Sequence, residues 1–256
     1  MIKTKIKNQV AILTLNRPEK YHSFIKDMAI DLQDALDQCE SDNNVRCIII
    51  TASGKAFCAG QDLSEAIDPD GPGLTKIVEK HYNPIIRKIR SIEKPILAAV
   101  NGVAAGAGAS IALCCDIVIA KKSAVFVQAF SKIGLVADSA GTFFLPRLIG
   151  LQRATALMMT ADPISAEEAK EIGMIYKVFN DDEFEIEAIK LAEKLAQMPT
   201  KGLGLTKKLL NSSLANNLEE QLTQELHVQT VAGQTNDYIE GVDAFLEKRK
   251  PKFKGN

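Results

Sequence analysis

The first half of the chain alternates between short apolar runs and amphipathic stretches. Apolar positions over 2–6 and 10–15 follow a strand pattern around the polar tripeptide Lys7-Asn8-Gln9, which predicts a hairpin. Apolar residues then recur at helical spacing over 24–39, with Ser23 placed to cap the helix. Further strands are expected at 46–51, 95–100 and 116–120, and further helices at 75–91 and 105–115. This alternation of strands and helices indicates an α/β layered core.

The pattern becomes almost entirely helical beyond about Leu145. Amphipathic helices are expected over 183–197, 201–215, 218–231 and 238–248. Helices that follow the core must bury their apolar faces somewhere, and a partner subunit is a common solution. We therefore expect a core that carries the site over residues 1–195 and a C-terminal helical oligomerisation region over 196–256.

Composition narrows the function classes. A hydrophobic content of 46% with 25% charged residues is typical of a soluble globular protein. A net charge of -1 does not indicate the excess of Lys and Arg with which proteins bind nucleic-acid phosphates. No apolar run reaches the roughly 18 residues that span a bilayer, and the N-terminus lacks the features of a signal peptide, so we expect a cytoplasmic protein. Five cysteines without a C-x-x-C pair favour reduced core thiols over disulfides or a zinc site.

Asp138 is the only acid in the otherwise almost uncharged segment 125–142. A carboxylate among apolar neighbours is disfavoured in its charged form, so its pKa should rise toward the range useful for moving protons. The alternative is a helix N-cap, because Ser139 could begin a helix and Asp is a favoured cap. The local pattern favours the cap.

Two segments rich in small residues follow predicted strands, one over 54–63 and one over 98–108. Small residues let backbone N–H groups approach a ligand, and such donors aimed at one oxygen stabilise an oxyanion without any side chain. The alternative is that they only permit tight strand-to-helix packing. The segment 106–111 does not fit the dinucleotide-binding motif G-x-G-x-x-G, because Ile111 stands where the third glycine is required. The segment 137–141 does not fit the nucleophile elbow G-x-S-x-G, because Ala137 stands where the first glycine is required.

Six segments, in order along nearly the whole chain, resemble the crotonase superfamily of enoyl-CoA hydratases and isomerases. They are Asn16-Arg17-Pro18, Phe57-Cys-Ala-Gly-Gln-Asp-Leu63, Lys94-Pro-Ile-Leu-Ala-Ala-Val-Asn-Gly102, Cys115-Asp116-Ile117, Leu145-Pro-Arg-Leu-Ile-Gly150 and Gly241-Val-Asp-Ala-Phe-Leu-Glu-Lys-Arg249. The resemblance implies a crotonase-like spiral of ββα units with a C-terminal helical trimerisation region. It also implies a homotrimer or hexamer and an acyl-CoA substrate, with no cofactor besides the CoA that is part of the substrate.

The resemblance further assigns site residues. It implies catalytic oxyanion donors on the backbone N–H groups of Gln61 and Ala107. The remaining substrate-binding positions implied by the family, including the loop for adenine and pantetheine, are Arg17, Ala59, Gly60, Gln61, Asp62, Leu63, Gly106, Gly108 and Phe130. The basic tail 248–254 is either a solvated end or a partner for CoA phosphates.

The departures from the family pattern point to isomerisation. Hydratases of the family use two glutamates, and those positions hold Ser110 and Phe130, so hydration should be weak or absent. Asp138 stands where several family isomerases carry their acid, and we expect it to be catalytic.

Two segments, 101–109 and 129–139, look most like the isomerases of bacterial phenylacetate degradation, which open a ring epoxide to an oxepin and shift double bonds. Where that group has Pro-Asp-x-Gly-Gly, this chain has Ala137-Asp-Ser-Ala140-Gly. A dienoyl-CoA isomerase, a weak enoyl-CoA hydratase and a non-catalytic structural partner of a hydratase remain as alternatives.

Overall fold

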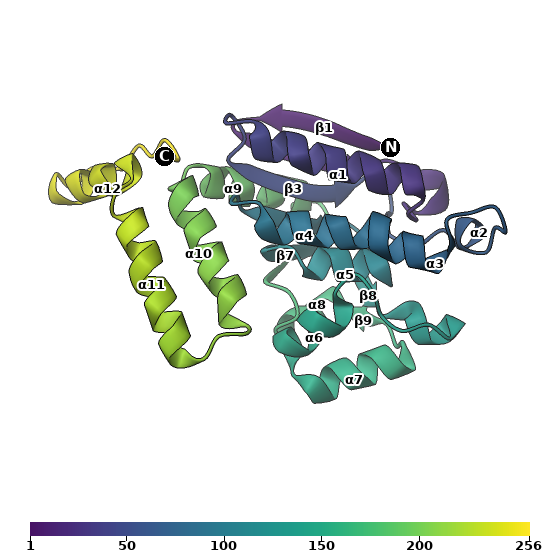
Figure 1. The fold of residues 1–256 in the computed structure, drawn as a ribbon. Helices are drawn as coiled ribbons and strands as arrows, with labels where there is room; N and C mark the ends of the chain where they lie inside the picture. The colour runs from purple at the N-terminus through teal and green to yellow at the C-terminus, as the bar shows by residue number, and fades with distance from the viewer.

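The computed structural model describes all 256 residues as two β-sheets surrounded by helices (Figure 1). The strands are β1 (Ile2–Lys7), β2 (Val10–Leu15), β3 (Cys47–Ala52), β4 (Ala56–Cys58), β5 (Ile96–Val100), β6 (Val103–Ala105), β7 (Ile117–Lys121), β8 (Val125–Val127), β9 (Ile164–Ser165) and β10 (Lys177–Phe179). The α-helices are α1 (Lys26–Ser41), α2 (Leu63–Ala66), α3 (Gly73–Lys76), α4 (Asn83–Ser91), α5 (Ala107–Leu113), α6 (Gly141–Ile149), α7 (Leu151–Thr160), α8 (Ala166–Glu171), α9 (Phe184–Ala196), α10 (Thr200–Ser213), α11 (Leu218–Ala232) and α12 (Asn236–Leu246). Three further turns are the 3₁₀ segments η1 (Pro18–Lys20) and η3 (Ala129–Ile133) and the π-helical η2 (Ile77–Tyr82).

The larger sheet has the strand order β1-β2-β3-β5-β7-β10, and only its first pair is antiparallel. Alternation along β3 sends Ile48 and Ile50 into the main core with α1 and α4, while Cys47 and Ile49 face α9. The central strands are therefore buried on both faces, which explains why they read as continuous apolar runs.

The smaller sheet has the order β4-β6-β8-β9 and positions the site. Its first three strands are parallel, and each is three residues long. Because the carboxyl ends of parallel strands meet at one edge, the loops leaving β4, β6 and β8 emerge side by side. These loops lead to Gln61, Ala107 and Phe130.

Most long elements fall where the sequence predicts them, and the α/β fold class is confirmed. The predicted cap of α1 is wrong: the N-cap is Ile25 without a side-chain bond, and Ser23 instead accepts hydrogen bonds from the Arg17 guanidinium. The helix expected over 75–91 is three pieces, α3, η2 and α4. The helix expected over 105–115 begins only after β6, at Ala107.

All five cysteines are free and buried, as predicted. No helix is long and apolar enough to cross a membrane. Helices α10, α11 and α12 lie to one side of the two sheets (Figure 1). They leave large apolar side chains exposed, among them Leu210, Leu218, Leu222, Leu226, Phe245 and Leu246. The expected division of the chain between residues 195 and 196, into a core and an oligomerisation region, stays a prediction. Helix α10 lies beyond that division but also bonds to the core.

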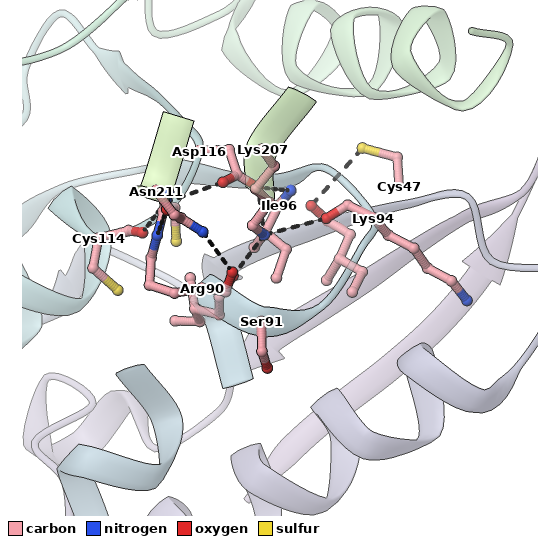
Figure 2. Close-up of polar contacts among 12 residues, drawn as sticks. Cys47, Arg90, Ser91, Lys94, Ile96, Cys114, Asp116, Lys207 and Asn211 are labelled. Atoms are coloured by element: carbon pink, nitrogen blue, oxygen red, sulfur yellow. Dashed lines mark hydrogen bonds and ion pairs between the residues drawn. The ribbon is translucent and has the colours of Figure 1, made fainter. Parts of the chain in front are cut away.

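A partly buried ion network joins α10 to that core (Figure 2). Asp116, just before β7, accepts from Lys207 Nζ of α10 at 2.8 Å and from Arg90 Nη1 of α4 at 3.1 Å. The same carboxylate accepts from the N–H of Ile96 at 2.8 Å. Burial disfavours the charged form of Lys207 and lowers its pKa, whereas the ion pair and hydrogen bond with Asp116 favour the charged form. The buried ammonium therefore depends on Asp116.

Replacing Asp116 by Ala should therefore destabilise the protein strongly. The change leaves the Lys207 ammonium buried without its carboxylate, and breaking a buried pair in this way costs about 3 to 5 kcal/mol. Urea unfolding at fixed protein concentration measures the loss. Glu167→Ala is the control, because its pair with Lys122 at 3.3 Å is exposed and is expected to contribute less than about 1 kcal/mol. Equal effects of the two changes would contradict the role given to the network.

Candidate active site

A cavity of about 210 Å³ lies at the carboxyl edge of the small sheet. The sequence-predicted site residues that line it are Ala59, Gly60, Gln61, Leu63, Gly106, Ala107, Phe130 and Asp138. The sequence did not point to the others, which are Ala66, Leu74, Ile77, Tyr82, Ala129, Lys132, Ile133 and Leu135. The lining is mostly apolar, with Asp138 as its only acid.

The two loops rich in small residues touch through their backbones. Gly60 has a φ of 94°, and a Cβ there would lie 3.1 Å from the carbonyl oxygen of Ala105. On the other loop, a Cβ on Gly108 would lie 2.5 Å from the carbonyl oxygen of Cys58, closer than packing allows. Glycine at both positions is therefore what permits the loops to approach each other.

This approach places two free backbone donors beside the cavity. The N–H of Phe24 donates to Gly60 O at 2.7 Å and the N–H of Asp62 donates to Phe24 O at 2.9 Å, which leaves the intervening N–H of Gln61 directed away from this bridge. Ala107 is the first residue of α5, so its N–H has no partner within the helix. Neither group donates to another residue. Two such donors can stabilise negative charge on one oxygen.

Asp138 does not cap α6, so the cap interpretation is wrong. The N-cap is Ala140, which is left-handed with a φ of 57° and makes no side-chain cap bond. The Asp138 carboxylate accepts from the Ser139 hydroxyl at 2.9 Å and lines the cavity. Burial raises the pKa of Asp138, and the bond from Ser139 offsets part of the rise. The carboxylate thus has the environment of a proton acceptor.

The two positions of the family glutamates offer no replacement acid. Ser110 is buried, its hydroxyl has no hydrogen-bond partner, and it does not line the cavity. Its Oγ packs behind Gly141, where a Cβ would approach it to 2.7 Å. Phe130 lines the cavity with an aromatic ring. Asp138 therefore faces the cavity without a second carboxylate.

Three predicted substrate-binding residues, Arg17, Asp62 and Gly108, do not line this cavity. Arg17 pairs with Asp62 at 2.7 Å, and Asp62 caps α2 through the N–H of Ser64. Burial opposes the ionisation of Asp62, but the bonds from Arg17 and Ser64 outweigh it and lower its pKa. Arg17 and Asp62 brace the loops, and a role of all three residues in CoA binding stays a prediction.

His22 belongs to the same bracing. Its Nδ1 accepts from the N–H of Arg17 at 3.0 Å, so its Nε2 carries the proton that it shares with Ser53 O at 2.6 Å. Burial lowers the pKa of His22, which favours this neutral form. No group of three or more His, Cys, Asp and Glu side chains comes together in a way that could hold a metal ion.

An apolar cavity with a lone carboxylate and two free N–H donors contains the kinds of group that proton transfer and stabilisation of an enolate require. Residues 5–256 match the family model for enoyl-CoA hydratase/isomerase. The chain therefore belongs to the enoyl-CoA hydratase/isomerase family, the crotonase superfamily.

Individual relatives include both isomerases and hydratases. The chain is 48% identical to 1,2-epoxyphenylacetyl-CoA isomerase from Escherichia coli (strain K12), over 99% of this chain and 98% of that protein. It is 37% identical to trans-2-decenoyl-[acyl-carrier-protein] isomerase from Streptococcus mutans, over 98% and 96% of the two chains. The crystal structure of enoyl-CoA hydratase from Bacillus anthracis matches with a TM-score of 0.93 at 33% identity, over 100% of this chain and 99% of that one.

Asp138→Asn should raise the melting temperature at neutral pH. Because the folded-state pKa of Asp138 is raised, the wild-type protein loses stability as pH rises through the interval between the unfolded and folded pKa values. Asparagine has no charge to bury and escapes this loss. Melting curves of both proteins between pH 8 and about 4 should show an advantage of the variant that shrinks as the pH falls.

Asp181→Asn is the matched control with the opposite sign. Hydrogen bonds from Ser123 lower the pKa of Asp181, so its ionised form supports folding at neutral pH and that support is lost as pH falls. This variant should melt lower than the parent at neutral pH. An Asp138→Asn protein that melts lower in the same way would show that the carboxylate is structural.

Proposed function

We propose that the protein is an acyl-CoA isomerase in which Asp138 moves a proton while the N–H groups of Gln61 and Ala107 bind the thioester oxygen. The observation that carries the proposal is the single carboxylate in an apolar cavity beside two unpaired backbone donors. Isomerisation needs one group that accepts a proton and returns it. Hydration needs a second group to activate water, and the site supplies none.

The reaction proceeds through a dienolate. The ionised Asp138 takes a proton from C2 of a 3-enoyl thioester. The electrons of that C–H bond form a C1=C2 bond conjugated with the C3=C4 bond, and the carbonyl π electrons move to the thioester oxygen. Negative charge on the thioester oxygen is held by the Gln61 and Ala107 N–H groups. Asp138 then returns the proton to C4. The C3=C4 electrons form the new C–H bond, the C1=C2 electrons move to C2=C3, and the carbonyl is restored, which leaves the 2-enoyl thioester and the ionised carboxylate.

Support for a ring-epoxide substrate comes from the E. coli relative, whose name describes an epoxyphenylacetyl-CoA isomerase. The cavity is apolar and carries the rings of Phe130 and Tyr82, which suits an aromatic-derived acyl group. Ala140 sits at a left-handed position that glycine usually fills, two residues after Asp138, and its methyl group packs against the core. We propose epoxide opening in phenylacetate catabolism as the more specific activity, alongside the double-bond shift of fatty acid metabolism.

The other candidates have weaker support. A dienoyl-CoA isomerase would need a second acid at Phe130, and a hydratase would need carboxylates at Phe130 and Ser110. A non-catalytic partner of a hydratase would have no use for free oxyanion donors and a carboxylate of raised pKa. The isomerase is the only candidate that uses all of these features.

We also propose that the enzyme works as a trimer or hexamer. The exposed apolar residues of α10, α11 and α12 support assembly through these helices, because a soluble monomer rarely exposes so much apolar surface in one region. Its five free thiols fit the reducing cytoplasm. The basic tail 248–254 is then available to CoA phosphates, although Arg249 pairs with Glu240 at 2.6 Å within the chain.

Asp138→Asn should lower kcat for conversion of 3-enoyl-CoA to 2-enoyl-CoA by at least about 100-fold, because the amide cannot accept the C2 proton. The absorbance of the conjugated product measures the rate. Ser110→Ala is the control: its hydroxyl lies behind Gly141, outside the cavity, so its rate should stay within about twofold of the parent. A folded Asp138→Asn enzyme at the parental rate would refute the mechanism.

Crotonyl-CoA should undergo little hydration. Each missing acid or base normally contributes on the order of 100- to 10,000-fold, so the rate should fall at least about 100-fold below that of a family hydratase assayed in parallel. Chromatography of the 3-hydroxyacyl product checks this. Hydration at the rate of the reference enzyme would show that the family glutamates are dispensable here.

A further inference from the structure

The side chain of Gln61 is held on both sides, although the family role of this residue uses only its backbone N–H. Its Oε1 accepts from the Tyr82 hydroxyl at 2.7 Å. Its Nε2 donates to Glu65 Oε2 at 2.9 Å. An amide fixed at both ends cannot rotate freely, so the peptide that carries the N–H is restrained as well.

Tyr82 also restrains Gln61 through Phe24. The two rings pack edge to face with centroids 5.8 Å apart. The backbone of Phe24 brackets Gln61, as its N–H and C=O bond the residues on either side. Tyr82 thus supports Gln61 in two ways, directly through its hydroxyl and indirectly through the ring that packs on Phe24. Its side chain is fully buried and still lines the cavity.

The position of Tyr82 depends on an irregular helix. It is the last residue of the π-helical η2, and Pro84 follows at the start of α4. Proline has no N–H, so it cannot donate to the carbonyl of Lys80 as a regular helix would require. Gln33 of α1 donates instead, to Lys80 O at 3.0 Å and His81 O at 3.1 Å. Single π turns of this kind are frequent at functional sites.

We propose that Tyr82 is a positioning residue that, through the Gln61 side chain, holds the Gln61 N–H toward the thioester oxygen. The proposal rests on the isomerase function proposed above. Burial is the main cause that raises the pKa of Tyr82, so its hydroxyl stays protonated and remains a donor at the pH of the reaction. A small displacement of an oxyanion donor weakens the transition state more than it weakens substrate binding.

Tyr82→Phe removes the hydroxyl and keeps the ring against Phe24. With 3-enoyl-CoA, kcat should fall about 10- to 100-fold while KM changes less than about threefold, because a misplaced donor acts mainly on the charged transition state. Gln61→Met keeps the backbone N–H but removes all three side-chain hydrogen bonds, the third being a longer one from Nε2 to Asp62 O at 3.3 Å, and should lower kcat by a similar factor. Tyr176→Phe is the control, since that tyrosine is exposed and lies outside the cavity.

The double variant tests whether Tyr82 acts through Gln61. If it does, Tyr82→Phe causes no further loss in the Gln61→Met background, so the two effects are not additive. A full additional loss there would mean that Tyr82 touches the substrate directly and would overturn the proposal. A Tyr82→Phe rate within twofold of the parent would overturn it too. If Tyr82→Phe fails to fold, the Gln61→Met variant alone tests the proposal. A kcat of Gln61→Met equal to that of the parent then refutes the proposal.

The carbonyl stretch of bound crotonyl-CoA tests positioning without turnover. Donors in an oxyanion hole polarise the thioester carbonyl and lower its stretching frequency, so the downshift on binding to the parent should become smaller in Tyr82→Phe. An equal downshift in both proteins refutes the role of Tyr82. If the parent isomerises 3-enoyl-CoA and Tyr82→Phe does so equally well, the role of Tyr82 is refuted but the proposed function stands. If the parent does not isomerise 3-enoyl-CoA, the proposed function is refuted, and the carbonyl measurement still tests the position of the donor.

Discussion

The site depends on the contact between two backbone loops at the edge of the small sheet. Gly108 lies so close to Cys58 that a Cβ would not fit, and Gly60 has a left-handed φ of 94° with little space for a Cβ beside the carbonyl of Ala105. Gln61 and Ala107 line the same cavity, and neither N–H group donates a hydrogen bond within the protein. The donors belong to the backbone, so the proposed means of stabilising an enolate does not depend on which acids the site carries. The acid that this chain keeps is Asp138.

Much of the frame of the site could be predicted from the sequence, because long elements carry periodic patterns. The hairpin at the N-terminus, α1, β3 and the late helices are of this kind. Strands β4, β6 and β8 were not foreseen, since three residues are too few to show alternation. These short strands bring the two loops together, so the convergence of Gln61 and Ala107 came from the family resemblance and not from the pattern.

Two local predictions failed because tertiary contacts took the side chains elsewhere. Ser23 was expected to cap α1 but is held by Arg17, and Asp138 matched a cap pattern although Ala140 begins α6. The contribution of Tyr82 was hidden in what reads as one continuous helix. Pro84, inside that pattern, was the available signal of an interruption. In each case the departure from regular structure lies at or next to the site, where strain and irregular backbone are commonly found.

In the proposed reaction one carboxylate removes and returns the same proton, and hydrogen tracing tests this directly. A 3-enoyl-CoA carrying deuterium at C2 is converted in ordinary water, and mass spectrometry with NMR locates the label in the 2-enoyl product. Asp138 lines a largely apolar cavity with no second acid, so part of the deuterium should appear at C4. A product with no deuterium at C4, even at the earliest times, would mean that the returned proton comes from another group or from water and would contradict the single-carboxylate account.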